Sequence, residues 1–217
     1  MNQDLVIFGA GGHAREVAQL VADINRAEPG RWNLLGFLAD SGVQARHAKP
    51  LPARLLGDVE WLHDQPSVQA IVAVGNPAGR RSVVERIERI RPDQRFATLV
   101  HPTAWIANGV ELGPGSVVFA GVLINVDVRI GCHGSINLGC SISHDCLLGD
   151  YVSLGPGVRL AGGVCFEPGV EAGTGAVCRP GIQVGAGAVI GAGAVLVGNP
   201  PPGCMAVGVP ARWQRTV

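Results

Sequence analysis

This chain of 217 residues has few charged and few aromatic side chains, no excess of positive or negative charge, and no long apolar segment. Charged residues make up 16% and aromatic residues 5% of it, and 17 basic side chains balance 17 acidic ones. No segment gathers the excess of lysine and arginine that binds a nucleic acid or an anionic membrane surface. We therefore expect neither nucleic acid nor a membrane as a partner.

Signals for export and for membrane insertion are also missing. No apolar run approaches the roughly 20 residues of a spanning helix. The first residues, "MNQDLVIFGAGG", lack the basic segment of a secretory leader. The six cysteines include no CxxC pair, which predicts reduced, buried thiols rather than disulfides. Together these features predict a cytoplasmic protein.

What the chain has in excess is glycine, and the distribution of glycine divides the sequence in two. Most of the 32 glycines lie in the second half. Residues 1–98 alternate apolar runs with helical patterns, which is typical of βαβ units with a parallel sheet. Strands are expected at 5–9, 34–40 and 69–75, and helices at 12–25, 58–64 and 78–90. We predict an α/β fold here, a Rossmann-like βαβ half-domain.

Residues 99–217 follow a six-residue period instead, up to a short C-terminal tail. Every sixth residue from Val100 to Leu196 is Val, Ile, Leu or Phe, except Ala172 and Cys178. A small or β-branched residue follows each of them up to Ile190 four positions later, with glycine and polar residues in between. This pattern predicts short strands joined by tight corners, in an all-β parallel β-helix of hexapeptide repeats with eighteen residues per coil. The period leaves the hand of the helix open.

One hexad, "ISHDCL", carries two neighbouring groups that can hold a proton. Ile142 and Cys146 take the inward positions, so His144 and Asp145 fall at the corner between them. A polar turn would also explain the pair. One coil later the sequence has Gly162, whose backbone would lie directly above the histidine and could face an oxyanion. A base, an orienting acid and an oxyanion donor describe acyl transfer.

Six motifs in order make the chain resemble a known family along nearly its whole length. They are "IFGAGGHAREV", "VGNPAGRR", "HPTA", "ISHDCLLGD", "LAGGV" and "GVPAR". The family comprises bacterial sugar acetyltransferases with an N-terminal nucleotide-binding domain and a left-handed β-helix. Some members N-acetylate nucleotide-linked amino sugars, and related members O-acetylate sialic acid.

The resemblance implies roles for particular residues and a homotrimer. It implies that His144 is the general base, that Asp145 orients it, and that the backbone at Gly162 binds the thioester carbonyl of acetyl-CoA. Acetyl-CoA would lie in the groove between adjacent prisms, against Ala161, Ser153, Gly208, Pro210 and Arg212. Many members have a histidine where this chain has Ser153, so the resemblance leaves a proton relay there in doubt.

The glycine-rich loop near the N-terminus predicts a phosphate site. Gly9, Gly11 and Ala14 fit G-x-G-x-x-A between a strand and a helix. A dinucleotide is excluded for two reasons. The first acidic residue that ends a strand, Asp40, lies farther along the chain than the acid that binds the ribose in dinucleotide sites, and only one mononucleotide-binding half is present. A nucleoside diphosphate sugar fits better. The resemblance places it against Gly11, Gly12, His13, Asp40, Gly75, Asn76 and Arg80, with the fork of Arg80 suited to phosphate.

Our first hypothesis is therefore acetyl-CoA-dependent N-acetylation of a nucleotide-linked amino sugar, with no metal cofactor. O-acetylation of a sugar hydroxyl is the nearest alternative. A zinc-dependent hydratase would use His133 with His144, but the sequence offers no suitable third histidine. A catalytically silent nucleotide-sugar-binding protein is a third alternative. Asn137 is expected to be a corner residue that could also touch the sugar.

Overall fold

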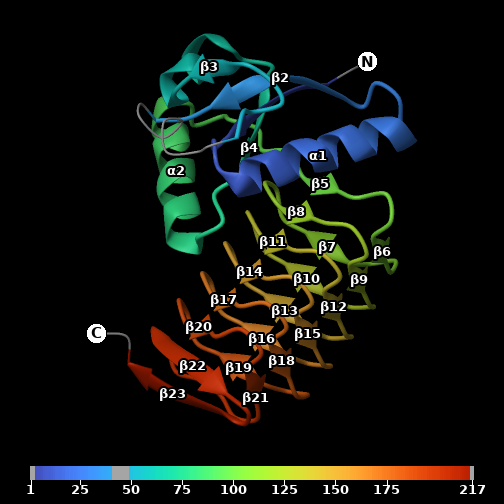
Figure 1. Ribbon diagram of the computed structural model, residues 1–217, viewed down its shortest axis with the longest axis vertical. Coiled ribbons are helices and arrows are strands. Elements are labelled where there is room, and N and C mark those ends of the chain that lie inside the picture. The colour runs from blue at the N-terminus through green and yellow to red at the C-terminus, as the bar shows by residue number, and fades with distance from the viewer. Residues whose placement is uncertain (1–2, 41–48, 216–217) are drawn as a thin grey trace. The chain divides into compact units, whose positions relative to one another are not determined.

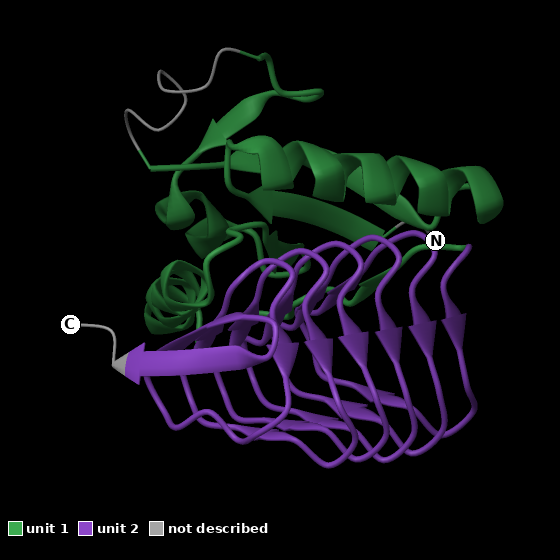
Figure 2. Ribbon diagram, turned by 60° about the horizontal axis from the view of Figure 1, so that its bottom comes forward, with its two compact units in different colours: residues 1–102 green, residues 103–217 purple. Residues whose placement is uncertain are grey.

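The computed structural model describes residues 3–40 and 49–215. Its chain divides into two compact units between Pro102 and Thr103, coloured separately in Figure 2. No helix in these described ranges is long and apolar enough to cross a membrane.

The first unit is built on a parallel sheet of four strands in the order β3-β2-β1-β4 (Figure 1). Its strands are β1 (Gln3–Phe8), β2 (Trp32–Leu38), β3 (Leu55–Gly57) and β4 (Gln69–Val72). Its helices are α1 (Gly12–Ala27), the 3-10 helix η2 (Val59–Asp64) and α2 (Pro77–Ile90). The short strand β5 (Leu99–Val100) follows them. The predicted Rossmann-like alternation of strands and helices is confirmed.

The helices form where one apolar face meets the sheet. Val17, Val21 and Ile24 on α1 are buried, and so are all residues from Leu5 to Phe8 on β1. The start of α2 is fixed by Asn76, whose Oδ1 accepts a hydrogen bond from the Gly79 N–H at 2.9 Å. The sequence pattern missed the short edge strand β3.

The second unit is a stack of three-sided coils whose sides are strands of two residues. The strands are β6 (Trp105–Ile106), β7 (Glu111–Leu112), β8 (Val117–Val118), β9 (Leu123–Ile124), β10 (Arg129–Ile130), β11 (Ser135–Ile136), β12 (Ser141–Ile142), β13 (Leu147–Leu148), β14 (Ser153–Leu154), β15 (Arg159–Leu160), β16 (Cys165–Phe166), β17 (Glu171–Ala172), β18 (Val177–Cys178), β19 (Gln183–Val184), β20 (Val189–Ile190) and β21 (Val195–Leu196). Every third strand pairs in parallel, so that Ile142 lies beside Ile124 on one side and Leu160 on the other. The period of eighteen residues per coil, and with it the left-handed parallel β-helix, is confirmed.

Three faces result, and we name each after one of its strands. The β12 face contains β6, β9, β12, β15, β18 and β21, and the β13 face contains β7, β10, β13, β16 and β19. The β14 face includes β8, β11, β14, β17 and β20. The predicted inward residues form a continuous buried column from Ser116 to Leu196, whereas those of the first coil, from Val100 to Leu112, are only partly buried. A parallel stack of this kind is stabilised mainly by contacts between successive coils.

The coils are joined by corners in the left-handed backbone region, which explains the excess of glycine. Gly157 and Gly175 are two of many examples, with φ of 70° and 68°. Only four residues other than glycine adopt positive φ in the described chain, namely Asp127, His133, Asp145 and Tyr151. Four corners, on two edges of the prism, therefore carry side chains where the fold favours glycine.

The chain ends in a hairpin that the sequence did not predict. Strand β22 (Cys204–Gly208) pairs in parallel with β20 and in antiparallel with β23 (Ala211–Arg215). The segment expected to be a short tail thus extends the β14 face.

Candidate active site

The corner between β12 and β13 presents His144 and Asp145 to solvent. Ile142 and Cys146, the two residues that flank them at inward positions, are 2% and 0% exposed. The side chains of His144 and Asp145 are 58% and 66% exposed. The predicted orientation of this hexad is confirmed.

The two side chains form a dyad through one short contact. Nδ1 of His144 lies 2.7 Å from Oδ2 of Asp145. Asp145 has φ of 60°, a conformation that aspartate tolerates better than most residues. A carboxylate acceptor at Nδ1 favours the tautomer with the proton on that nitrogen, which leaves the lone pair of Nε2 free to accept a proton.

The histidine ring packs directly over Gly162 of the next coil. The Gly163 N–H donates to the carbonyl of His144 at 2.9 Å, which fixes the register of this corner. A methyl group added to Gly162 would lie 2.5 Å from Cε1 and 2.6 Å from Nε2 of His144. Only glycine therefore permits this approach. The stacking predicted from sequence spacing is confirmed.

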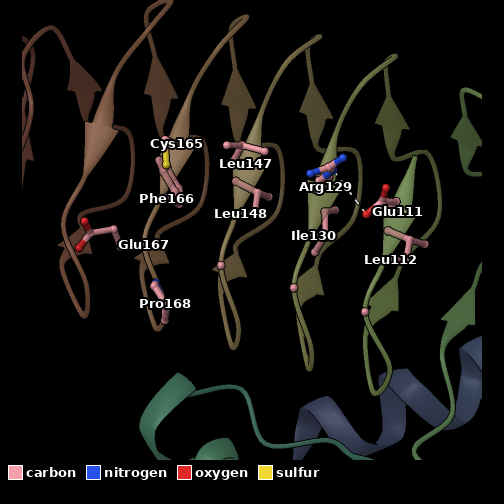
Figure 3. A pocket seen from close by; sticks show the side chains of 13 residues that line it. Glu111, Leu112, Arg129, Ile130, Leu147, Leu148, Cys165, Phe166, Glu167 and Pro168 are labelled. Carbon is pink, nitrogen blue, oxygen red and sulfur yellow. Dashed lines mark ion pairs between the residues drawn. The ribbon is translucent and has the colours of Figure 1, made fainter. Parts of the chain in front are cut away.

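The dyad opens onto a groove over the β13 face. A pocket of about 310 Å³ beside Asp145 is lined also by Asp127, Glu111 and Arg129. Glu111, Arg129 and Leu147 continue into a groove of about 530 Å³ that reaches Phe166. Figure 3 shows Arg129 and Glu111 on neighbouring strands, joined by an ion pair. The distance from Nε of Arg129 to Oε2 of Glu111 is 3.4 Å. A reactant could therefore approach the dyad along this face.

Other residues predicted for this region lie on different parts of the β-helix. Ser153 is on the β14 face and is 9% exposed. Asn137 follows β11, and its Oδ1 accepts a hydrogen bond from the Leu138 N–H at 2.7 Å. Ala161 precedes Gly162, and its carbonyl accepts from the thiol of Cys146. Gly208, Pro210 and Arg212 lie at the turn of the β22–β23 hairpin.

Three buried cysteines of the β-helix are not poised for chemistry. All six are free thiols. Burial raises the pKa of Cys140 and of Cys146, and it raises the pKa of Cys178 to about 12. Because the thiolate is the reactive form, these groups are inert parts of the core.

His133 belongs to a different corner from His144. It lies between β10 and β11 and is 4% exposed. Its ring stacks on Tyr151 of the next coil, with centroids 5.1 Å apart. Among residues 3–40 and 49–215, no group of three His, Cys, Asp or Glu side chains is arranged to hold a metal ion.

A second candidate site lies at the carboxyl edge of the first unit's sheet. Strands β1 and β4 are neighbours, while β2 and β3 lie on the far side of β1, so the connections diverge at β1 and β4. Ligands of open α/β sheets bind at such a switch point. Gly9, with φ of 134°, brings the loop after β1 close to β4, since a methyl group there would lie 2.7 Å from the carbonyl oxygen of Ala73.

The predicted glycines open helix α1 without a side-chain cap. Gly11 is the N-cap residue and Gly12 begins the helix, and the first turn has no acidic residue. Next to them, His13 Nδ1 lies 3.1 Å from Oε2 of Glu16. Burial lowers the pKa of His13, and nearby Arg80 adds to this, although Glu16 acts in the opposite direction. The helix start thus places the backbone N–H groups of Gly11 and Gly12 beside an imidazole whose pKa is below its ordinary value.

Arg80 differs from the expectation of a guanidinium open to phosphate. It is 2% exposed, and its Nη1 donates to the carbonyls of Val74 at 2.7 Å and Gly75 at 2.9 Å. The side chain therefore supports the loop after β4 from beneath. The sequence could not show this, because the position of Arg80 at a helix start is equally compatible with solvent exposure.

Asp40, predicted to lie near the base or ribose, follows β2 and has a partner that the sequence did not reveal. Arg86 on α2 binds it through two contacts of 2.6 Å and 2.9 Å. The hydrogen bonds from Arg86 hold the pKa of Asp40 below its usual range. Forty-six residues separate the two, so only the packing of α2 brings them together.

Comparisons with known proteins agree on one group. The family described as the PglD N-terminal domain matches residues 4–87. GDP-perosamine N-acetyltransferase of Escherichia coli O157:H7 is 30% identical over 165 residues, which are 74% of this chain and 71% of that protein. UDP-N-acetylbacillosamine N-acetyltransferase of Bacillus subtilis strain 168 is 34% identical over 121 residues, 54% of this chain and 52% of that protein.

Solved structures match over nearly the full length. PerB from Caulobacter crescentus, in complex with CoA and GDP-perosamine, has a TM-score of 0.86 and 31% identity, and the match covers 97% of each chain. The acetyltransferase domain of PglB from Neisseria gonorrhoeae FA1090, in complex with acetyl coenzyme A, has a TM-score of 0.87 and 30% identity. That match covers 98% of this chain and 99% of the other.

Proposed function

Because this chain belongs to the family of bacterial nucleotide-sugar N-acetyltransferases, we propose that it acetylates the amino group of a sugar carried on a nucleoside diphosphate. Acetyl-CoA is the acetyl donor. The observation that carries the proposal is the His144 ring, bonded to Asp145 and packed over Gly162. The relatives are N-acetyltransferases by name, which favours an amine over a hydroxyl as the acceptor.

The reaction needs one base at the corner. The lone pair of the sugar amine attacks the carbonyl carbon of the thioester, and Nε2 of His144 takes a proton from the nitrogen as the C–N bond forms. Asp145 holds the ring through Nδ1 and stabilises the imidazolium. The tetrahedral intermediate then collapses, the C–S bond breaks, and the thiolate of CoA leaves with the electron pair.

Gly162 is the group best placed to stabilise the intermediate. The absence of a side chain at Gly162 lets the His144 ring lie close to the backbone, and the Gly162 N–H donates no hydrogen bond within the described structure. A preorganised backbone donor of this kind stabilises the developing oxyanion more than it stabilises the ground state.

In this proposal the first unit, which contains the predicted nucleotide-sugar-binding domain of residues 1–98, holds the nucleotide. The free N–H groups at Gly11 and Gly12 face the diphosphate, as helix N-termini do in other phosphate sites. His13 lies beside them, and the loop of Gly75 and Asn76, supported by Arg80, forms the opposite wall. Asp40, held by Arg86, remains 43% exposed and is available to the ribose or the base.

Residues 99–217 form the acetyltransferase domain in this proposal. Acetyl-CoA follows the corner from Gly162 past Ala161 towards the hairpin at Gly208, Pro210 and Arg212. Ser153 contributes a hydroxyl from a neighbouring prism, and Asn137 contacts the sugar. These two roles require a homotrimer, which the half-exposed Trp105 and Leu123 on the β12 face support. We place the reaction in the cytoplasm, where the six free thiols stay reduced.

Replacement of His144 tests the base role. We expect His144→Ala to lower kcat by about 10²- to 10⁴-fold, the usual contribution of a general base, and to leave the Kd of CoA unchanged. His63→Asn is the matched control, because His63 is exposed and lies in the other unit. Assays use UDP-, GDP- and dTDP-linked amino sugars, with mass analysis of the product. Loss of CoA binding at unchanged turnover per bound complex would contradict the assignment.

A further inference from the structure

The first turn of α1 contains Arg15, a residue of the motif "IFGAGGHAREV" that has no role assigned from the sequence. Nη1 of Arg15 is shielded from solvent and has no hydrogen-bond partner in the structure. Nη2 lies 3.8 Å from the point where a methyl group on Gly12 would be, so the guanidinium folds back over the helix start. Arg15 is therefore an unsatisfied cation at the loop that is proposed to hold the nucleotide.

Neighbouring arginines are already engaged, which makes Arg15 distinct. Arg86 binds the carboxylate of Asp40, and Arg80 donates to backbone carbonyls. Arg15 makes no ion pair within the described ranges, and its own helix offers no acid in the first turn. A buried donor without an acceptor is unfavourable, and such donors in native proteins normally find a partner in a ligand or water.

The partner must be an anion of a particular shape. The uncapped N–H groups of α1 and the guanidinium of Arg15 both favour negative charge, and both lie beside Gly12, which has no side chain in the way. A guanidinium binds phosphate oxygens through two parallel hydrogen bonds, whereas a ribose hydroxyl or a base cannot balance its charge.

We propose that Arg15 binds the diphosphate of the nucleotide sugar and makes the site selective for a diphosphate over a monophosphate. This inference rests on the proposed function, since it names a ligand of the same nucleotide site. Arg15 takes the phosphate-binding role that the family resemblance implied for Arg80, and Arg80 supports the loop after β4 through its hydrogen bonds to the carbonyls of Val74 and Gly75.

Kinetics of three variants test the proposal. Arg15→Gln removes the charge, Arg15→Lys keeps the charge without the fork, and Arg26→Gln is the control on the last turn of the same helix, where Arg26 is 73% exposed. We expect Arg15→Gln to raise KM for the nucleotide sugar about 10- to 100-fold, as for a lost hydrogen bond to a charged group. Because the diphosphate does not react, kcat and KM for acetyl-CoA should stay near wild type. Arg15→Lys should fall between wild type and Arg15→Gln.

Calorimetry separates this inference from the proposed function. GDP, UDP and dTDP are titrated into the wild type and each variant, followed by the matching monophosphates. Arg15→Gln should raise the Kd of the diphosphate that binds the wild type most tightly by about 10- to 100-fold. The Kd of the matching monophosphate should rise much less. An equal rise in the Kd of the diphosphate and the monophosphate, or equal effects of Arg15→Gln and Arg26→Gln, would overturn the role of Arg15.

If the wild type binds a diphosphate in this way but acetylates no nucleotide amino sugar, the proposed function fails while the role of Arg15 stands. Thermal unfolding checks that Arg15→Gln is folded, and Arg15→Lys provides the comparison if it is not.

Discussion

Gly162→Ala should inactivate the enzyme without unfolding it. The added methyl group would lie 2.5 Å from Cε1, 2.6 Å from Nε2 and 3.2 Å from Nδ1 of His144. Ordinary carbon contacts begin at about 3.5 Å, so the ring must move by roughly 1 Å. That movement pulls Nδ1 away from Asp145, to which it is bonded at 2.7 Å.

The size of the effect follows from the geometry. A displacement of about 1 Å in a catalytic group lowers the rate by about 10²-fold. Stability should change by less than about 1 kcal/mol, because the clash is with the end of an exposed side chain that can swing into solvent. The assay is kcat/KM for acetylation, together with the Kd of CoA and the melting temperature.

Gly175→Ala is the matched control with the opposite pattern. Nothing lies within 4 Å of a methyl group at Gly175, but its φ of 68° strains any residue other than glycine. We expect it to lose about 1 kcal/mol of stability and to keep full activity. If Gly162→Ala kept its rate within about threefold, a change of under 1 kcal/mol, the position of His144 over Gly162 would not matter for catalysis.

Two further predictions concern the histidines of the two sites. Asp145→Asn should lower kcat by about 10²- to 10⁴-fold while CoA binding persists, because the amide can no longer hold the tautomer with the proton on Nδ1; a pH–rate profile with unchanged amplitude would argue against this. Burial lowers the pKa of His13 in the folded state, so below about pH 6.5 the unfolded chain binds the proton first. Stability that is complete above the unfolded pKa is then lost as the pH falls. The melting temperature of the wild type should therefore drop more between pH 7 and pH 5 than that of His13→Gln, and parallel curves would show that His13 does not contribute.

The catalytic corner was predictable because the β-helix is nearly one-dimensional. Each coil contacts only its neighbours, so a sequence separation of eighteen residues is also a spatial neighbourhood. The unbroken period from Val100 to Leu196 therefore predicts from the sequence alone that Gly162 lies over His144. The inward and outward sides of "ISHDCL" followed from the same period.

The nucleotide site was less accessible to sequence reasoning, because tertiary packing decides it. The pairing of Asp40 with Arg86 depends on how α2 lies against the sheet, and no local pattern encodes that. Arg80 and Arg15 both occupy the first turn of a helix, yet one is committed to carbonyls and the other has an unpaired nitrogen. The hairpin of β22 and β23 broke the six-residue period and left no other signal.

Because the β-helix is built from repeated coils, the length of the prism can change without a change in the geometry of the catalytic corner. An insertion or deletion of one whole coil between Gly162 and the hairpin would lengthen or shorten the prism and return every later side chain to its former face. The His144–Asp145 corner would not be disturbed, because its contacts lie within its own coil and the coils directly before and after it. Loss of a single residue would instead turn the aliphatic column outward. Evolution can therefore lengthen or shorten this β-helix by whole coils, while the geometry of the catalytic corner stays the same.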